Sequence, residues 1–138
     1  MIHTETLTLI SDGRFHAFNV TEEVRAAVRT AGIRAGSALV FYRHTTGAVM
    51  IVEHEAGMLL DLEEVLEQIT PVARDYKHHL RGVDFNGAAH VRTALMNVSV
   101  TVPVLDGDLA VGTYQDIVVL DMDPEPRPRT VIVQVMGE

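Results

Sequence analysis

The sequence SALVFYRHTTGAVMIVEHEAG, residues 37–57, holds two apolar runs separated by a four-residue polar link. Residues 37–43 and 48–52 have the length and the β-branched and aromatic content of buried strands. The link is His-Thr-Thr-Gly at 44–47, and Glu-His-Glu at 53–55 follows the second run. Titratable residues at strand ends either lie in solvent or belong to a site, and both interpretations are open at this point.

Strands are also predicted on both sides of this pair, from alternating or continuous apolar runs bounded by turn residues. They are expected at residues 2–10, 14–20, 98–105, 109–123 and 130–135. The Asp12-Gly13 pair predicts a tight turn, and therefore a hairpin of the first two strands. Several strands follow one another at the end of the chain instead of alternating with helices, which favours an α+β fold over a doubly wound sheet.

Three helices are predicted from apolar residues at helical spacing. The first carries Val24, Ala27, Val28 and Ala31, begins near Asn19 or Thr21, and ends at Gly32. The second covers residues 58–69, with Leu59, Leu62, Val65, Leu66 and Ile69 inward. The third covers residues 88–96 and is capped by Asn86. Residues 72–86 between the last two helices lack a clear period and are expected to form a long loop, as functional loops often do.

Composition restricts the protein to a few classes. The 138 residues suggest one domain, 1–138, and 47% hydrophobic residues is an ordinary globular content. The absence of cysteine excludes disulfides and thiolate metal sites. A formal net charge of −8 argues against nucleic acid as a partner, because phosphate-backbone binding requires clustered Lys and Arg. No signal peptide or membrane span is evident, so we expect a cytoplasmic protein with no membrane partner.

Histidines gather in three short segments of the sequence. His44 begins the polar link, His78 lies in the long loop, and His90 lies on the third helix. If they converge with Glu53, they make a divalent-cation site for Zn or Mg with an open position. Without a metal, the same group can act as general acid and base, since histidine titrates near neutral pH.

Each candidate also has an ordinary structural explanation. A single histidine is more often a surface residue or a hydrogen-bonded core residue than a ligand, and the chain has no compact ligand motif such as HExxH. Glu53 and Asp61 can face water, Thr45 and Thr46 are common strand residues, and Gln115 fits an exposed strand edge.

The order of these motifs resembles the YjbQ family, also named secondary thiamine-phosphate synthase-like, over nearly the whole chain. The motifs that carry the resemblance are His44-Thr45-Thr46-Gly47, Glu53, Asp61, Tyr76-Lys77-His78, Asn86-Gly87-Ala88-Ala89-His90, Gly112-Thr113-Tyr114-Gln115 and Arg127-Pro128-Arg129. Two positions depart from the pattern. Many relatives have Asn-Glu-Asn where this chain has Val52-Glu53-His54, and Trp-Gln where it has Tyr114-Gln115.

The resemblance implies a compact α+β domain with a large mixed or antiparallel sheet and about three helices. It also implies a homotrimer with sites near the subunit boundaries. The implied activity is thiamine-phosphate synthesis, which joins a pyrimidine-methyl diphosphate to a thiazole phosphate and releases pyrophosphate. The implied catalytic positions are His44, Glu53, Asp61, His78, His90 and Gln115.

Release of pyrophosphate builds negative charge that cations and protonated histidines stabilise. We therefore expect His44, His78 and His90 to contact metal or phosphate, with Glu53 and Asp61 either orienting them or holding the metal directly. The residues expected to hold the substrate's phosphate are Thr45, Thr46, Asn86, Arg127 and Arg129. Two other functions remain open: a metal-assisted phosphate-ester hydrolase, and a non-catalytic module that binds a small anionic metabolite.

Overall fold

The computed structural model describes residues 1–138 as eight strands, three α-helices and one 3₁₀ helix. The strands are β1 (Ile2–Ser11), β2 (His16–Asn19), β3 (Gly36–Tyr42), β4 (Gly47–Val52), β5 (Ser99–Leu105), β6 (Asp108–Leu109), β7 (Asp116–Asp121) and β8 (Arg127–Gly137). The helices are α1 (Thr21–Ala31), α2 (Ala56–Ile69), the 3₁₀ helix η1 (Lys77–Arg81) and α3 (Gly87–Leu95). Helices lie between groups of strands that pair only antiparallel, which confirms the predicted α+β class.

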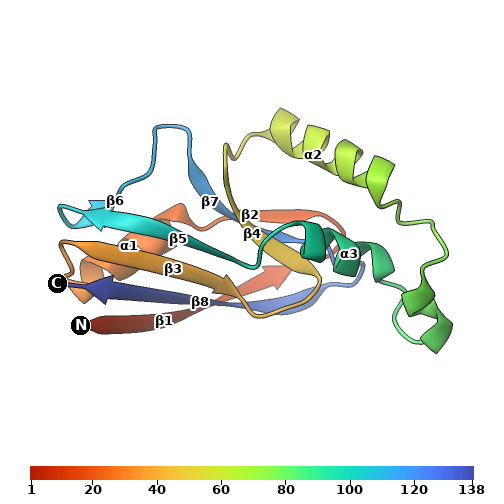
Figure 1. Ribbon diagram of the computed structural model, residues 1–138, viewed down its shortest axis with the longest axis horizontal. Helices are drawn as coiled ribbons and strands as arrows, with labels where there is room; N and C mark the ends of the chain where they lie inside the picture. Colours follow the sequence, from red (N-terminus) through yellow and green to blue (C-terminus); the bar gives the residue numbers. More distant parts are fainter.

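The strands form two sheets in which every pair is antiparallel. The larger sheet has the order β1-β8-β3-β5-β6, and the smaller has the order β2-β7-β4. β1 runs beside β8 from one end to the other, so the two termini lie side by side (Figure 1). The predicted hairpin of the first two strands is wrong, because β1 pairs with β8 and β2 pairs with β7. The turn at Gly13 and Arg14, both with positive φ, takes the chain from one sheet to the other.

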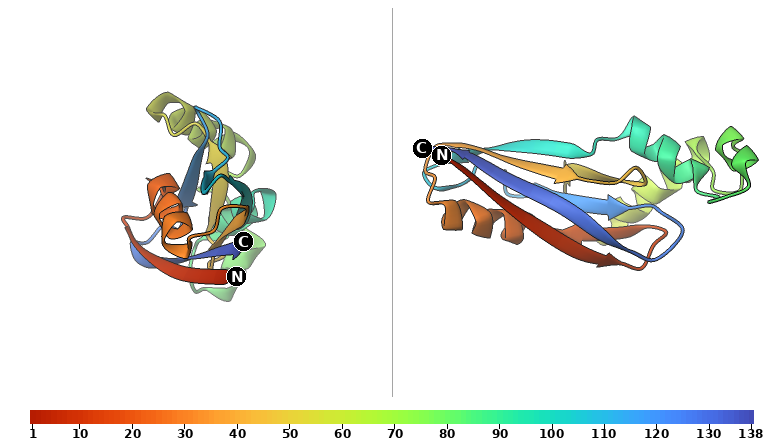
Figure 2. Two further views of the ribbon diagram at one scale, coloured as in Figure 1. Left: turned by 90° about the vertical axis from the view of Figure 1, so that its left-hand side faces the viewer. Right: turned by 90° about the horizontal axis from the view of Figure 1, so that it is seen from below.

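The main hydrophobic core lies between the two sheets and α1. The predicted inward stripe of α1, Val24, Ala27, Val28 and Ala31, is buried there together with the inner valines of β3, β5 and β8. A second, smaller core lies on the other face of the smaller sheet, where Leu66 of α2 and Ala89 of α3 pack on Leu120. The end-on view shows α1 enclosed by the curled sheets, while α2 projects away from them (Figure 2).

The helix ends match the sequence better at α1 than at α2 and α3. At α1, Asn19 Oδ1 accepts a hydrogen bond from the Thr21 N–H at 3.1 Å, and Gly32 ends the helix in the left-handed conformation. α2 begins earlier than predicted because the Glu55 carboxylate accepts hydrogen bonds from two backbone N–H groups of its first turn. Asn86 occupies the N-cap position of α3 as predicted, but its side chain makes no capping hydrogen bond to the helix.

The inward face predicted for α2 is only partly correct. Leu66 is its only buried residue, whereas Val65 and Ile69 are about half exposed. α2 reaches the smaller sheet over a short stretch and extends beyond it (Figure 1). Leu62 packs against the second core, whereas Leu60, Val65 and Ile69 stay exposed in this chain.

Three further features of the chain differ from the expectation. The long loop contains the 3₁₀ helix Lys77–Arg81, whose shorter hydrogen-bond spacing leaves no 3.6-residue period in the sequence. The run predicted as one strand, 109–123, divides into β6 and β7 with a non-strand segment between them. β8 begins at Arg127, three residues before the predicted start. None of the helices has the length and apolar character needed to cross a bilayer.

Gly36 marks a close approach between β3 and β8, and its replacement gives a first prediction. A Cβ at this position would lie 1.9 Å from the Met136 carbonyl oxygen, where only backbone could move aside. We expect Gly36→Ala to lower the free energy of unfolding by about 3 kcal/mol in urea denaturation. Gly112→Ala is the matched control, because its Cβ would meet nothing closer than 3.4 Å. Equal stability of the two variants would contradict this packing.

Candidate anion-binding site

A polar cavity of about 390 Å³ lies where the β3–β4 link, η1, α3 and the start of β8 meet. No hydrophobic residue lines it. Its walls are Arg43, His44, Thr45, Thr46, His78, Arg81, Asp84, Asn86, His90, Asp123, Arg127 and Arg129. The structure thus brings together residues from all three histidine-bearing segments, although they are far apart in the sequence.

Arg129 forms the buried floor of this cavity. It is only 4% exposed, and one of its Nη atoms donates to Thr46 Oγ1 and to Asp121 Oδ1, each at 3.0 Å. Asp121 is fully buried at the end of β7. Because a buried guanidinium requires a charge partner, this pair fixes the arginine in one position beneath the cavity.

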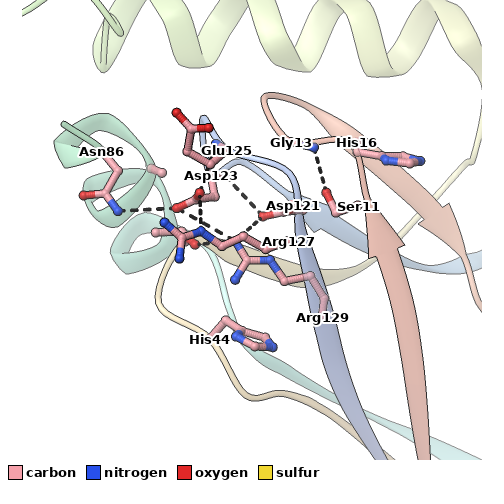
Figure 3. Close-up of polar contacts among 12 residues, drawn as sticks. Ser11, Gly13, His16, His44, Asn86, Asp121, Asp123, Glu125, Arg127 and Arg129 are labelled. Carbon is pink, nitrogen blue, oxygen red and sulfur yellow. Dashed lines mark hydrogen bonds and ion pairs between the residues drawn. The ribbon is translucent and has the colours of Figure 1, made fainter. Parts of the chain in front are cut away.

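Arg127 lies two residues earlier on β8, at the mouth of the cavity. Its Nε donates to Asp123 Oδ2 at 3.0 Å, and Asp84 lies 3.9 Å from one of its Nη atoms. Asn86 Nδ2 donates to the other oxygen of Asp123 at 3.4 Å. Figure 3 shows Asp123 between the side chains of Asn86 and Arg127.

Asp123 remains a carboxylate in this arrangement. Burial alone would raise its pKa, but hydrogen bonds from the Glu125 N–H, Arg127 and Asn86 stabilise the charged form and lower the pKa overall. Asp123 therefore orients both neighbouring side chains while staying negatively charged.

The three histidines have different hydrogen-bonding roles. His44 Nε2 accepts from the Thr130 N–H at 2.8 Å, so its other ring nitrogen carries the proton in the neutral form. His78 and His90 lie against each other, with ring centroids 4.6 Å apart, and the His90 ring is hydrogen-bonded to the Thr45 backbone. Burial lowers the pKa of both His44 and His90, helped by the charge of Arg129 at His44 and of His78 at His90.

Unsatisfied polar atoms are concentrated at this cavity. Five buried side-chain polar atoms of the protein lack a hydrogen-bond partner. Three belong to cavity residues, namely His78 Nε2, Asn86 Oδ1 and Arg129 Nε. The other two, Asp121 Oδ2 and the Tyr42 hydroxyl, are neighbours, because burial and the adjacent Asp121 carboxylate together raise the pKa of Tyr42. Buried polar groups are nearly always paired, so the three unpaired atoms of lining residues mark this cavity as a candidate site.

The charge of the cavity favours an anion. Four arginines face two aspartates among the lining residues, and the buried Asp121 pairs with Arg129, which leaves an excess of one positive charge when the histidines are neutral. Guanidinium groups offer paired donors that match phosphate and carboxylate oxygens. The cavity therefore combines positive charge and directed donors within a protein of net charge −8.

One of the three histidines predicted to bind a metal ion already uses a ring nitrogen within the protein. His44 uses its Nε2 lone pair to accept the Thr130 N–H, so that nitrogen is not free to coordinate a cation. No group of three or more His, Asp or Glu side chains is arranged to hold a metal ion. The nearby arginines also disfavour a divalent cation. Binding of Zn or Mg by His44, His78 and His90 stays a prediction.

Three predicted site residues lie away from the cavity. Glu53 and Gln115 adjoin the paired ends of β4 and β7, Val52 and Asp116, whereas the cavity lies at the opposite end of these strands. Six residues of β4 separate the two ends, a distance of roughly 20 Å. Gln115 Oε1 accepts from the Gly112 N–H at 2.8 Å. Asp61 is exposed on α2 and does not line the cavity.

The sequence interpretation missed several charged residues of the site. It did not consider Arg43 and Arg81, although each lies close to a segment that carries a candidate histidine. It also did not consider Asp84, Asp121 and Asp123. A usable signal was present in DMDPEPRPR, residues 121–129, where three acidic residues at 121, 123 and 125 precede two arginines at 127 and 129. The prolines predict a bend here, which brings the opposite charges close together.

The lowered histidine pKa values give a pH prediction for anion binding. Because His44 and His90 are neutral at pH 7, acidification through their pKa values, below the ordinary 6.5, adds positive charge to the cavity. We expect sulfate affinity, measured by calorimetry, to rise as the pH falls from 8 to 5. Sulfate is a suitable probe since it remains a dianion over this range. A flat profile would contradict the assignment, and His54→Gln, at an exposed histidine outside the cavity, is the control.

Comparison with known proteins agrees with this architecture. The family model described as "UPF0047 protein YjbQ-like" matches residues 5–138. The chain is 40% identical over 130 residues to a UPF0047 protein of Archaeoglobus fulgidus, covering 94% of this chain and 98% of the relative. It is 36% identical over 137 residues to one of Methanothermobacter thermautotrophicus, covering 99% and 94%.

Solved structures match over the full length as well. A YbjQ-like protein of unknown function from Sulfolobus solfataricus superposes with a TM-score of 0.93 at 29% identity, covering 100% of this chain and 99% of the other. A hypothetical protein from Aeropyrum pernix gives a TM-score of 0.90 at 34% identity, with 98% of both chains covered. Both sequence and fold therefore agree with the motifs quoted above, and the chain belongs to the YjbQ, or UPF0047, family.

Proposed function

We propose that the polar cavity binds the phosphate or diphosphate group of a small metabolite, and that the protein is an enzyme acting on it. The observation that supports this best is the excess of arginines at one cavity, beside the unsatisfied donor Nε of Arg129. A phosphate group supplies the negative charge and the acceptor oxygens that such donors require. Its binding would offset the cost of holding several guanidiniums close together.

Arg43, Arg81 and Arg127 are the groups that would contact the anion directly. Arg43 and Arg81 make no ion pair with a carboxylate within 4.0 Å, and Arg127 is 45% exposed in its side chain. Arg129 lies beneath them, held by Asp121, and acts on the anion mainly through the electrostatic field of its guanidinium. The histidines would donate hydrogen bonds or exchange a proton with the ligand as the pH changes.

The reaction suggested by the family resemblance suits a site of this kind. In a thiamine-phosphate synthase-like transfer, a pyrimidine-methyl diphosphate loses pyrophosphate as its carbon joins a thiazole phosphate. Negative charge develops on the leaving oxygens, and preorganised arginines stabilise that charge without rearranging. Thr45, beside His90, and Asn86, beside Asp123, would help to orient the substrate. The specific reaction that we propose is therefore this transfer, catalysed in the cytoplasm.

The proposal includes a homotrimer in which a neighbouring chain adds Glu53, Asp61 and Gln115 to the site, because one chain cannot bring them to the cavity. The outer face of the larger sheet supports association, since no element of this chain covers it. Its residues are uncharged: Ile2, Thr4, Thr6, Thr8 and Ile10 of β1, Thr130, Ile132, Gln134 and Met136 of β8, and Ser37, Leu39 and Phe41 of β3. An uncharged sheet face of this size is typical of an interface. Light scattering giving three times the chain mass of 15.2 kDa would support the trimer.

Calorimetry with pyrophosphate tests the proposed ligand class. We expect binding at one site per chain, weakened by salt because the contacts are electrostatic. Turnover of the pyrimidine and thiazole phosphates, followed by pyrophosphate release, would support the transferase. Turnover of phosphate esters that is abolished by a chelator would favour a metal-assisted hydrolase, and tight binding without turnover would favour a binding module. Failure of every phosphate compound to bind would overturn the proposal.

Elemental analysis tests the metal separately. A stoichiometric metal in the purified protein that is lost in His90→Ala would support a histidine-bound cation at this site. Equal metal content in both proteins, or none in either, would count against it.

A further inference from the structure

Tyr42, the last residue of β3, is fully buried beside the polar cavity but does not line it. Its side chain is the largest of those that are fully buried in this protein, and its hydroxyl has no hydrogen-bond partner. Phenylalanine would fill the same space without the cost of burying an unpaired hydroxyl. A tyrosine at this position therefore suggests that the hydroxyl has a task.

The ring of Tyr42 lies directly against the His-Thr-Thr-Gly link, residues 44–47. A Cβ on Gly47 would lie 2.5 Å from Tyr42 Cε2 and 2.9 Å from Cζ, the carbon that carries the hydroxyl. The ring of His44 lies 4.9 Å from the Tyr42 ring. Gly47 is also the cross-strand partner of Asp121, so the Tyr42 hydroxyl lies next to the Asp121 carboxylate.

The Asp121 carboxylate uses only one of its two oxygens. Oδ1 accepts from Arg129 Nη2 at 3.0 Å and from the Asp123 N–H at 3.1 Å, whereas the buried Oδ2 accepts from no group. The Tyr42 hydroxyl is the neighbouring donor. Burial and the Asp121 carboxylate raise the pKa of Tyr42, so the hydroxyl keeps the proton that it can donate to Oδ2.

The Arg129 guanidinium is paired on only half of its edge. The Nε–H and one Nη–H of an arginine form a fork that matches the two oxygens of a carboxylate. Here Nη2 is paired with Asp121 Oδ1, while Nε and Oδ2, the two atoms of the second prong, both lack a partner. The ion pair thus stops short of the two-pronged arrangement that arginine and aspartate favour.

The difference between one prong and two matters at a cavity with an excess of only one positive charge. Closure of the fork would neutralise Arg129 more completely and weaken its attraction for an anion. We propose that Tyr42 is a positioning residue of the anion site, whose hydroxyl holds Asp121 Oδ2 away from Arg129 Nε. The guanidinium then stays partly neutralised and keeps its Nε donor for the anion. This inference rests on the proposed function for its effect on binding, and it adds a residue outside the cavity wall that sets the strength of the site.

Tyr42→Phe tests the inference, because it keeps the ring against Gly47 and removes only the hydroxyl. We expect the pyrophosphate affinity measured by calorimetry to fall by about threefold to tenfold, the range of one net hydrogen bond. The urea midpoint should not decrease, since the fork closes and no buried acceptor is left alone. Tyr76→Phe is the matched control, because its hydroxyl donates to the Pro71 carbonyl at 2.7 Å away from the polar cavity. This control should show a lower urea midpoint and wild-type affinity.

Heteronuclear NMR of the arginine Nε–H groups gives a readout that an ordinary core role would not change. The Arg129 signal is assigned by its loss in Arg129→Lys. In Tyr42→Phe without ligand, this signal should shift and its proton should exchange more slowly with water, because Nε gains Asp121 Oδ2 as an acceptor. Tyr76→Phe should leave the signal unchanged.

The outcomes separate this inference from the proposed function. Wild-type affinity in Tyr42→Phe, or an unchanged Arg129 signal, would overturn the role of Tyr42 and leave the anion site standing. Absence of binding by the wild-type protein would overturn the anion site itself, and the NMR comparison would still decide whether Tyr42 holds the ion pair open.

Discussion

Asp121→Ala is expected to lower the free energy of unfolding by about 3–5 kcal/mol. The substitution leaves the Arg129 guanidinium buried beneath the cavity without its nearest charge partner, 3.0 Å away. Asp123, at 3.8 Å from the same group, replaces that partner only in part and is already bonded to Arg127. Urea denaturation followed by circular dichroism gives the change directly.

Two companion variants make this stability prediction specific. Asp75→Asn is the matched control, because Asp75 is exposed and its carboxylate has no ion-pair or hydrogen-bond partner within the chain; its effect should stay within about 0.5 kcal/mol. Replacing both partners, as Asp121→Leu with Arg129→Met, should cost less than Asp121→Ala alone, since no unpaired charge remains. If Asp121→Ala were as stable as Asp75→Asn, the buried pair would not be an organising element of the site.

Arg127→Ala is expected to weaken pyrophosphate binding by roughly tenfold to a hundredfold, the loss of one or two charge-assisted hydrogen bonds. The variant removes a guanidinium at the mouth of the cavity and also leaves the Asp123 carboxylate uncompensated there. Arg127→Lys should retain part of the affinity, because it keeps the charge but loses the forked donors. Calorimetry at fixed salt concentration measures the three affinities.

Arg34→Ala is the control for charge alone. Arg34 is 72% exposed and its nearest carboxylate, Asp106, is 4.0 Å away, outside the cavity. It should bind pyrophosphate as the wild-type protein does. Equal losses of pyrophosphate affinity in Arg34→Ala and Arg127→Ala would mean that binding depends only on the overall charge of the protein. That result would contradict a defined site.

The parts of the fold that follow from local pattern were predictable from the sequence. The stripe of α1 and its glycine stop are short-range signals, and the apolar runs of β3 and β4 have the expected length. Strand pairing was not predictable in this way. The Asp12-Gly13 turn predicts a hairpin, yet β1 finds a longer partner in β8, more than a hundred residues away. Such long-range pairing depends on the whole set of strands and not on the turn.

The candidate site was likewise predictable only in part. Residue types and order led to His44, His78 and His90, which do line one cavity. The sequence did not reveal that Glu53 and Gln115 lie at the far end of β4 from that cavity, so that one chain cannot bring them to it. The buried pair of Arg129 with Asp121 was also missed, since an acidic residue that ends an apolar strand looks like a solvated end in the sequence. Burial becomes visible only when the sheets are assembled.

A crystal structure of the protein soaked with pyrophosphate tests the central claim most directly. The account predicts density for the anion in the polar cavity, with its oxygens within hydrogen-bonding distance of the Arg127 guanidinium and of at least one of Arg43, Arg81 and His90. Pyrophosphate bound only elsewhere on the protein, with this cavity holding water alone at a saturating concentration, would contradict it.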